Sequence, residues 1–108
     1  MRRLALLGAI ALAAAGCGGS GRIPLETLAA KQQAYVGKRV TTSGTVLQEH
    51  DPSGKTYYVL GGAGGSLVGL LPAKRAARYV DAHVVVSGVF RIVPGFGRAI
   101  RVSRIERG

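Results

Sequence analysis

The segment Y-V-G-K-R-V-T-T-S-G-T-V, residues 35–46, returns in variant form as Y-V-D-A-H-V-V-V-S-G-V-F at residues 79–90. Aligned without a gap, the copies share a tyrosine, two valines, a serine and a glycine. Apolar or β-branched side chains fall on alternate positions of both copies: Val40, Thr42 and Val46, then Val84, Val86 and Phe90. A period of two places such residues on one face of a sheet, so both copies are predicted strands. The glycine on that face predicts a strand that bends sharply around a small core.

The length and composition indicate one globular domain. The chain has 108 residues, of which 47% are hydrophobic and 19% are charged, and this excludes a disordered chain. It contains no tryptophan and only two phenylalanines, so the core must consist mainly of valine, leucine, isoleucine and tyrosine. These features favour a compact barrel over a large pocket.

The chain is strongly basic. Fifteen lysines and arginines against five acidic residues give a formal charge of +10, which becomes +8 without Arg2 and Arg3. Such a surplus attracts polyanions by an interaction that salt screens. The sequence leaves two interpretations open. One is binding of nucleic acid, anionic lipid or an acidic envelope polymer, and the other is plain solubility in a basic proteome.

The amino terminus has the pattern of an export signal. A basic start, Met1-Arg2-Arg3, precedes an apolar run from Leu4 to Gly16, which is too short to span a bilayer unaided. Residues 1–16 are therefore predicted to be a signal peptide.

The end of this run, Ala14-Ala15-Gly16-Cys17, resembles the lipobox of bacterial lipoproteins, with Ala14 in place of the usual leucine. The resemblance implies transfer of a diacylglycerol group, with palmitate-type chains, to the Cys17 thiol, cleavage of the peptide bond before Cys17, and attachment of the chain to a bacterial membrane in the cell envelope. Cys17 is the only cysteine, so the chain contains no internal disulfide. The alternatives are an ordinary secretory leader and a leader that is not cut. Residues 17–23, rich in glycine, are predicted to form a flexible tether.

Residues 24–108 are predicted to form one mainly β domain. A short amphipathic helix over 24–36 precedes the first strand, and a second helix begins at Pro72. The glycines at 61–65 lack the residues of a phosphate-binding loop and are predicted to turn a hairpin. The expected strands are 38–49, 55–60, 66–71, 83–93 and 98–105.

This β-β-β-α-β-β order resembles the OB-fold, a five-stranded partly open barrel with a helix between strands three and four. The most specific part is the short helix running into Tyr35-Val36-Gly37-Lys38, followed by Val40 and Ser43-Gly44. The likeness covers about residues 24–106, and the pattern resembles that of small bacterial OB domains, many of which are exported. It implies a ligand surface across strands two and three and between the loops that join strands one to two and four to five.

Aromatic and basic residues occupy these places. Aromatic rings stack on bases while arginines and lysines follow phosphates, and the alternative is that the rings fill the barrel and the arginines form a solvated edge. Strand alternation sends Tyr57 and Tyr58 to opposite faces, so one is expected in the core. The candidate ligand-binding residues are Lys55, Tyr57, Tyr58, Arg91, Phe96, Arg98 and Arg101.

The sequence predicts neither catalysis nor a cofactor. A nucleophile needs a base, and the chain offers only His50 and His83, with no Gly-x-Ser-x-Gly elbow. His50 lies between Glu49 and Asp51, but adjacent residues point in different directions, so no metal site is predicted. We therefore expect a non-enzymatic, lipid-anchored extracytoplasmic binding module whose partner is a phospholipid headgroup, an envelope polymer or an envelope protein. The alternative is a single-stranded nucleic-acid-binding protein.

Overall fold

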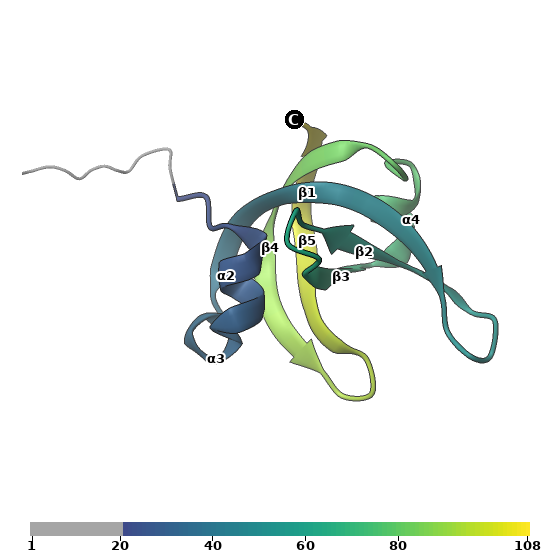
Figure 1. Cartoon of the computed structure of the whole chain (residues 1–108), viewed down its shortest axis with the longest axis horizontal. Coiled ribbons are helices and arrows are strands. Elements are labelled where there is room, and N and C mark those ends of the chain that lie inside the picture. Colours follow the sequence, from purple (N-terminus) through teal and green to yellow (C-terminus); the bar gives the residue numbers. More distant parts are fainter. Residues whose placement is uncertain (1–20) are drawn as a thin grey trace, which may run out of the picture.

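The computed structural model describes residues 21–108. The expected signal peptide, Cys17 and most of the expected tether lie outside these residues. The described part is mainly β, as predicted (Figure 1). In order, the elements are α2 (Leu25–Ala30), α3 (Gln32–Tyr35), β1 (Arg39–His50), β2 (Thr56–Gly61), β3 (Leu67–Leu71), α4 (Ala73–Ala77), β4 (His83–Val93) and β5 (Gly97–Arg107).

The five strands form one sheet that closes on itself in the order β1-β2-β3-β5-β4. All neighbouring pairs are antiparallel except β3 and β5, which run parallel. The long strand β1 crosses the whole sheet, pairing with β4 through its first half and with β2 through its second. In Figure 1, α2 and α3 lie to one side of the closed sheet and α4 lies to the other.

The repeated segments are neighbouring strands. They pair antiparallel, with Val40 opposite Gly88, Thr42 opposite Val86 and Gly44 opposite Val84. The alternate side chains singled out in the sequence point inward, and all six are buried. Both glycines are also buried on the inner side. A Cβ on Gly88 would collide with the backbone of Arg101, at a bulge between β4 and β5, so only glycine fits at this point of the inner side.

An approximate two-fold axis relates the two copies. Gly37 N–H donates to Phe90 O at 2.8 Å, and its counterpart Asp81 N–H donates to Val46 O at 2.7 Å. Gly37 and Asp81 both have positive φ, 83° and 70°. The next residue of each copy repeats the match, because Lys38 O accepts from Phe90 N–H at 2.9 Å and Ala82 O accepts from Val46 N–H at 3.0 Å. In each copy, the turn before the strand is therefore hydrogen-bonded to the last residue of the other copy.

The interior of the closed sheet is a continuous aliphatic core. Phe90 is its largest fully buried side chain, and the helices add Leu25, Leu28 and Ala76 to it. Thr42 is the one polar residue among those buried in the described part, and its hydroxyl has no hydrogen-bond partner there.

The first helix differs from prediction because it breaks at Lys31, which has φ −119° and separates α2 from α3. Glu26 on α2 reaches the glycine loop of residues 61–65, where its carboxylate accepts a hydrogen bond from Gly64 N–H at 3.0 Å. This bond lowers the pKa of Glu26 below its ordinary value of 4.5. The loop joins β2 to β3 as predicted. Its Gly64 N–H is already hydrogen-bonded to a carboxylate of the same chain.

Candidate binding face

The strand register decides which of the two adjacent tyrosines is exposed to a ligand. Tyr58 lies opposite Gln48 and packs against the core cluster, so it belongs to the inner side. Tyr57 lies opposite Glu49 on the outer side of β2. Of the two, Tyr57 is therefore the residue available for contact with a ligand on the sheet surface.

Phe96, in the turn between β4 and β5, folds back onto this outer surface. Its ring meets that of Tyr57 edge to face, with centroids 5.5 Å apart and an interplanar angle of 79°. Such pairs contribute about 0.5–1.5 kcal/mol beyond the area they bury. We call Tyr57, Phe96 and the underlying Gly69 the aromatic face. Phe96 remains 38% exposed, so a ligand can still reach its ring.

Gly69 makes room for the Phe96 ring. A Cβ at this position of β3 would collide with ring atoms of Phe96. Its cross-strand neighbours Val59 and Ala99 are buried, although alternation directs them outward. Sequence reasoning did not select Gly69. The available signal was a glycine inside a strand, which marks a close approach by another group.

Arg98 is held beside the aromatic face. Its Nε donates to Leu67 O at 3.1 Å, linking β5 to β3. Leu67 and Ile92, the cross-strand partner of Arg98, are exposed by 42% and 39%. Arg98 is thus a cation tied to the backbone of β3, at an end of the sheet where apolar side chains are exposed.

The remaining candidates lie around this region. Arg91 is opposite Ala99 and Arg101 is opposite Val89, so both point outward from β4 and β5 and both are exposed. Lys55 is exposed in the turn just before β2. The structure thus places Tyr57, Phe96 and Arg91 on one outer surface, adds Arg98 at its end, and separates Tyr58 from them.

The loop between β1 and β2 is built by internal hydrogen bonds. Asp51 accepts hydrogen bonds from the Ser53 hydroxyl, the Ser53 N–H and the Lys55 N–H, and the Ser53 hydroxyl bond is the main reason that the pKa of Asp51 lies below its ordinary value. His50 Nδ1 lies 3.1 Å from Thr56 Oγ1, and both residues belong to the strands that flank this turn. Within residues 21–108, no three His, Cys, Asp or Glu side chains come together as metal ligands would.

The cations greatly outnumber the groups that could neutralise them. Residues 21–108 contain 13 lysines and arginines and five acidic residues. In this part of the chain the one ion pair is Arg104 with Glu106, at 2.8 Å, and both side chains are largely exposed. Two of the five carboxylates, Glu26 and Asp51, are instead bonded to backbone N–H groups. Most of the positive charge is therefore available to an external anion.

None of the helices within residues 21–108 has the length and apolar character needed to cross a membrane. No protein-family model matches the chain, and a comparison with curated proteins finds no match.

Proposed function

We propose that this protein is a non-catalytic OB-fold module, anchored to a bacterial membrane through Cys17 and facing away from the cytoplasm, that binds an anionic ligand on its basic surface. The observation that carries the proposal is the set of 13 cations with a single ion pair among the described residues. A protein surface with this imbalance draws anions toward it over about a Debye length, roughly 8 Å at physiological ionic strength.

The OB-fold part of the proposal rests on connectivity. The order β-β-β-α-β-β, the ring β1-β2-β3-β5-β4 and the parallel pairing of β3 with β5 agree with a small Greek-key barrel of this type. In OB-folds the ligand surface lies on strands two and three and the adjoining loops, and here that surface carries the aromatic face. The fold alone does not specify a ligand, because it hosts many functions.

The anchoring part is tested on Cys17. Cells producing the full chain are labelled with a palmitate analogue and separated into membrane and soluble fractions. The wild-type chain should carry the label and sediment with membranes. The Cys17→Ser variant should lose the label, and a labelled Cys17→Ser chain would contradict acylation at this thiol.

The binding part is tested with the full chain in nonionic detergent. Its retention by mixed micelles containing phosphatidylglycerol is compared at about 50 and 200 mM salt, because electrostatic binding weakens steeply over this range. Uncharged micelles serve as the control. Retention that is absent, or that does not change with salt, would refute an electrostatic anion-binding surface.

A second function, binding of single-stranded nucleic acid, is favoured by the Tyr57–Phe96 ring pair. Each base stacked on such a ring contributes about 1–3 kcal/mol. Phe96→Ala should therefore weaken binding of a single-stranded oligonucleotide by about tenfold or more. Val36→Ala is the matched control, because Val36 is similarly exposed, at 41%, and lies before β1, outside the aromatic face. Equal effects of the two substitutions would exclude stacking on Phe96.

A further inference from the structure

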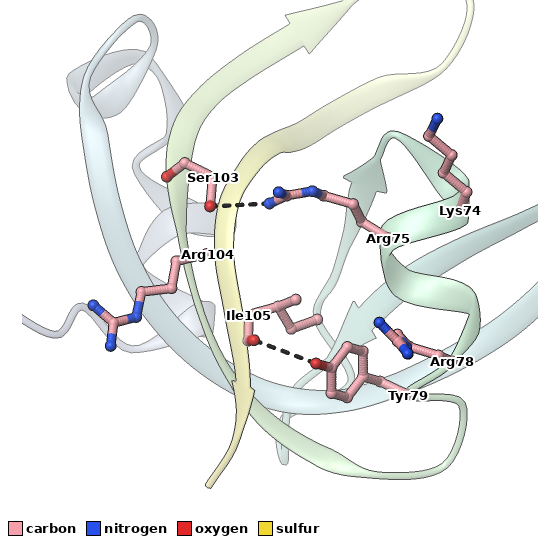
Figure 2. Close-up of a pocket in the computed structure, with 7 residues that line it drawn as sticks. All are labelled: Lys74, Arg75, Arg78, Tyr79, Ser103, Arg104 and Ile105. Atoms are coloured by element: carbon pink, nitrogen blue, oxygen red, sulfur yellow. Dashed lines mark hydrogen bonds between the residues drawn. The ribbon is translucent and has the colours of Figure 1, made fainter.

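A second surface, unrelated to the aromatic face, has the features of an anion site. Between α4 and β5 the molecule is hollowed over a volume of about 380 Å³. Four of its seven lining residues are lysine or arginine, although the side chain of one of them, Arg104, extends away from it, and none is acidic. We call this region, lined by Lys74, Arg75, Arg78, Tyr79 and the chain at 103–105, the basic hollow (Figure 2).

Arg75 is fixed in the basic hollow by the backbone of β5. Its Nη1 donates to Ser103 O at 2.9 Å and lies 3.5 Å from Val102 O. These carbonyls belong to a bulge, because β4 pairs Ser87 with Arg104 and Gly88 with Val102, which leaves Ser103 unpaired. A guanidinium has five N–H donors, and these two contacts use only Nη1. The remaining donors are therefore available on a group whose position is already set.

Arg78 adds a second guanidinium on the same side of α4. It follows Arg75 by three residues, a spacing that brings helical side chains together. Figure 2 shows its guanidinium beside the Tyr79 ring, whereas Arg104 extends from the far side of β5, away from the hollow. Arg104 is paired with Glu106, so the nearest carboxylate of β5 is engaged with a different cation. Within residues 21–108, the Arg78 side chain makes neither a hydrogen bond nor an ion pair with the rest of the protein.

Tyr79 supplies the apolar wall. Its hydroxyl lies 3.5 Å from Ile105 O, and Arg107 stands 5.1 Å from the centre of its ring. Arg75, Arg78 and Arg107 thus all belong to this side of the molecule, with Arg107 over the tyrosine ring. Like charges gathered in this way repel one another, and a bound oxyanion relieves that repulsion while accepting paired hydrogen bonds from the guanidinium forks.

We infer that the basic hollow binds a phosphate ester: the phosphate oxygens accept hydrogen bonds from Arg75 and Arg78, and a small organic group lies against Tyr79. The volume is that of a small-molecule site rather than of a bare ion, since such sites span about 300–1,000 Å³. The inference rests on the proposed function only in that the ligand is an anion. The phosphate can come from a soluble ester or from a phospholipid headgroup.

The test uses the full chain in nonionic detergent, with amide proton–nitrogen spectra as the readout. Glycerol phosphate is titrated as the soluble ester, inorganic phosphate as the bare ion, and phosphatidylglycerol is added to the micelles as the lipid source. Saturable shifts at residues 74–79 and 103–105 are expected with glycerol phosphate, at lower concentration than with inorganic phosphate. Comparable shifts with phosphatidylglycerol identify the headgroup as a source, and their absence assigns the site to soluble esters.

Arg78→Gln is the decisive variant, because the described part of the chain has no side-chain hydrogen bond or ion pair that depends on Arg78. Its affinity for glycerol phosphate should fall about tenfold, the loss typical of one charge-assisted hydrogen bond. Lys38→Gln is the matched control, since it removes one exposed charge near α3, on the other side of the closed sheet. It should change the affinity less than about twofold, as expected for a distant screened charge.

Two results would overturn the inference. One is the absence of saturable shifts in the basic hollow with every phosphate probe. The other is an equal loss of affinity in Arg78→Gln and Lys38→Gln, which would show attraction by net charge alone. In the second case anion binding by the protein would stand and only its placement would be wrong. A different result is that the protein is not retained by anionic micelles and still binds glycerol phosphate. That result would reject attraction to membranes and would leave the assignment of the basic hollow intact.

Discussion

Replacing Thr42 with valine should stabilise the protein. Thr42 is fully buried, and its hydroxyl has no partner within the described residues. A buried polar group without a hydrogen bond costs about 1–3 kcal/mol, and valine has nearly the same shape as threonine. The new methyl group would face Val86 across the β1–β4 pair, in the core where apolar contacts are made. We expect the free energy of unfolding to rise by about 1–2 kcal/mol.

The neighbouring threonine provides the control. Thr41 Oγ1 lies 2.8 Å from Ser87 Oγ, so its hydroxyl is satisfied. Thr41→Val should lower the free energy of unfolding by about 1 kcal/mol, the net value of an ordinary hydrogen bond. The two substitutions are chemically identical and one residue apart, yet they should act in opposite directions.

Thermal unfolding followed by circular dichroism measures both effects. For a domain of this size, 1 kcal/mol corresponds to roughly 4–8 °C in the melting temperature. Thr42→Val should melt several degrees above the wild type and Thr41→Val several degrees below it. Equal destabilisation by both would refute the reasoning, because it would mean that the Thr42 hydroxyl makes a hydrogen bond, for example to a buried water.

Three further predictions each concern a single residue. Gly69→Ala should push the Phe96 ring off the aromatic face, at a cost of about 1 kcal/mol, and nuclear magnetic resonance should show the ring-current shift on Tyr57 lost; an unchanged shift would contradict the packing. The Glu26 carboxylate, whose pKa is lowered mainly by the Gly64 N–H, contributes stability above its unfolded pKa, and this is lost as the pH falls through the folded value; the Gly64 amide shift should titrate with a midpoint below 4.5 and not at all in Glu26→Gln. Gly37→Ala should cost about 1–2 kcal/mol in urea unfolding because φ is +83° and the added Cβ meets no other atom, and Gly37→Asn should recover part of it; equal losses would point to another cause.

The mainly β fold was accessible from the sequence because it depends on local signals. Alternating apolar residues set the inner sides of β1 and β4, and the turn residues near Pro52, Gly64 and Gly95 mark the hairpins. The break at Lys31 was missed, since strong helix formers continue on both sides of it. Propensity could not show that Glu26 reaches a loop 38 residues away.

The candidate sites depend on register, and register is a property of pairing. The sequence placed Tyr57 and Tyr58 on opposite faces, but only their partners Glu49 and Gln48 show which one is outside. Phe96 directly precedes β5 and packs on Gly69 of β3. These two strands pair in parallel although they lie far apart in the sequence, and no local pattern reveals such a pairing. The basic hollow was missed for the same reason, because it needs the unpaired Ser103 of β5 to meet Arg75 of α4.

The two-fold relation between β1 and β4 has a consequence for self-association. Every backbone bond between the copies can equally be made between β1 of one molecule and β4 of another, since the two arms are near-equivalent. Strand exchange through this pair at high concentration would therefore give an interlocked dimer that keeps the same backbone hydrogen bonds.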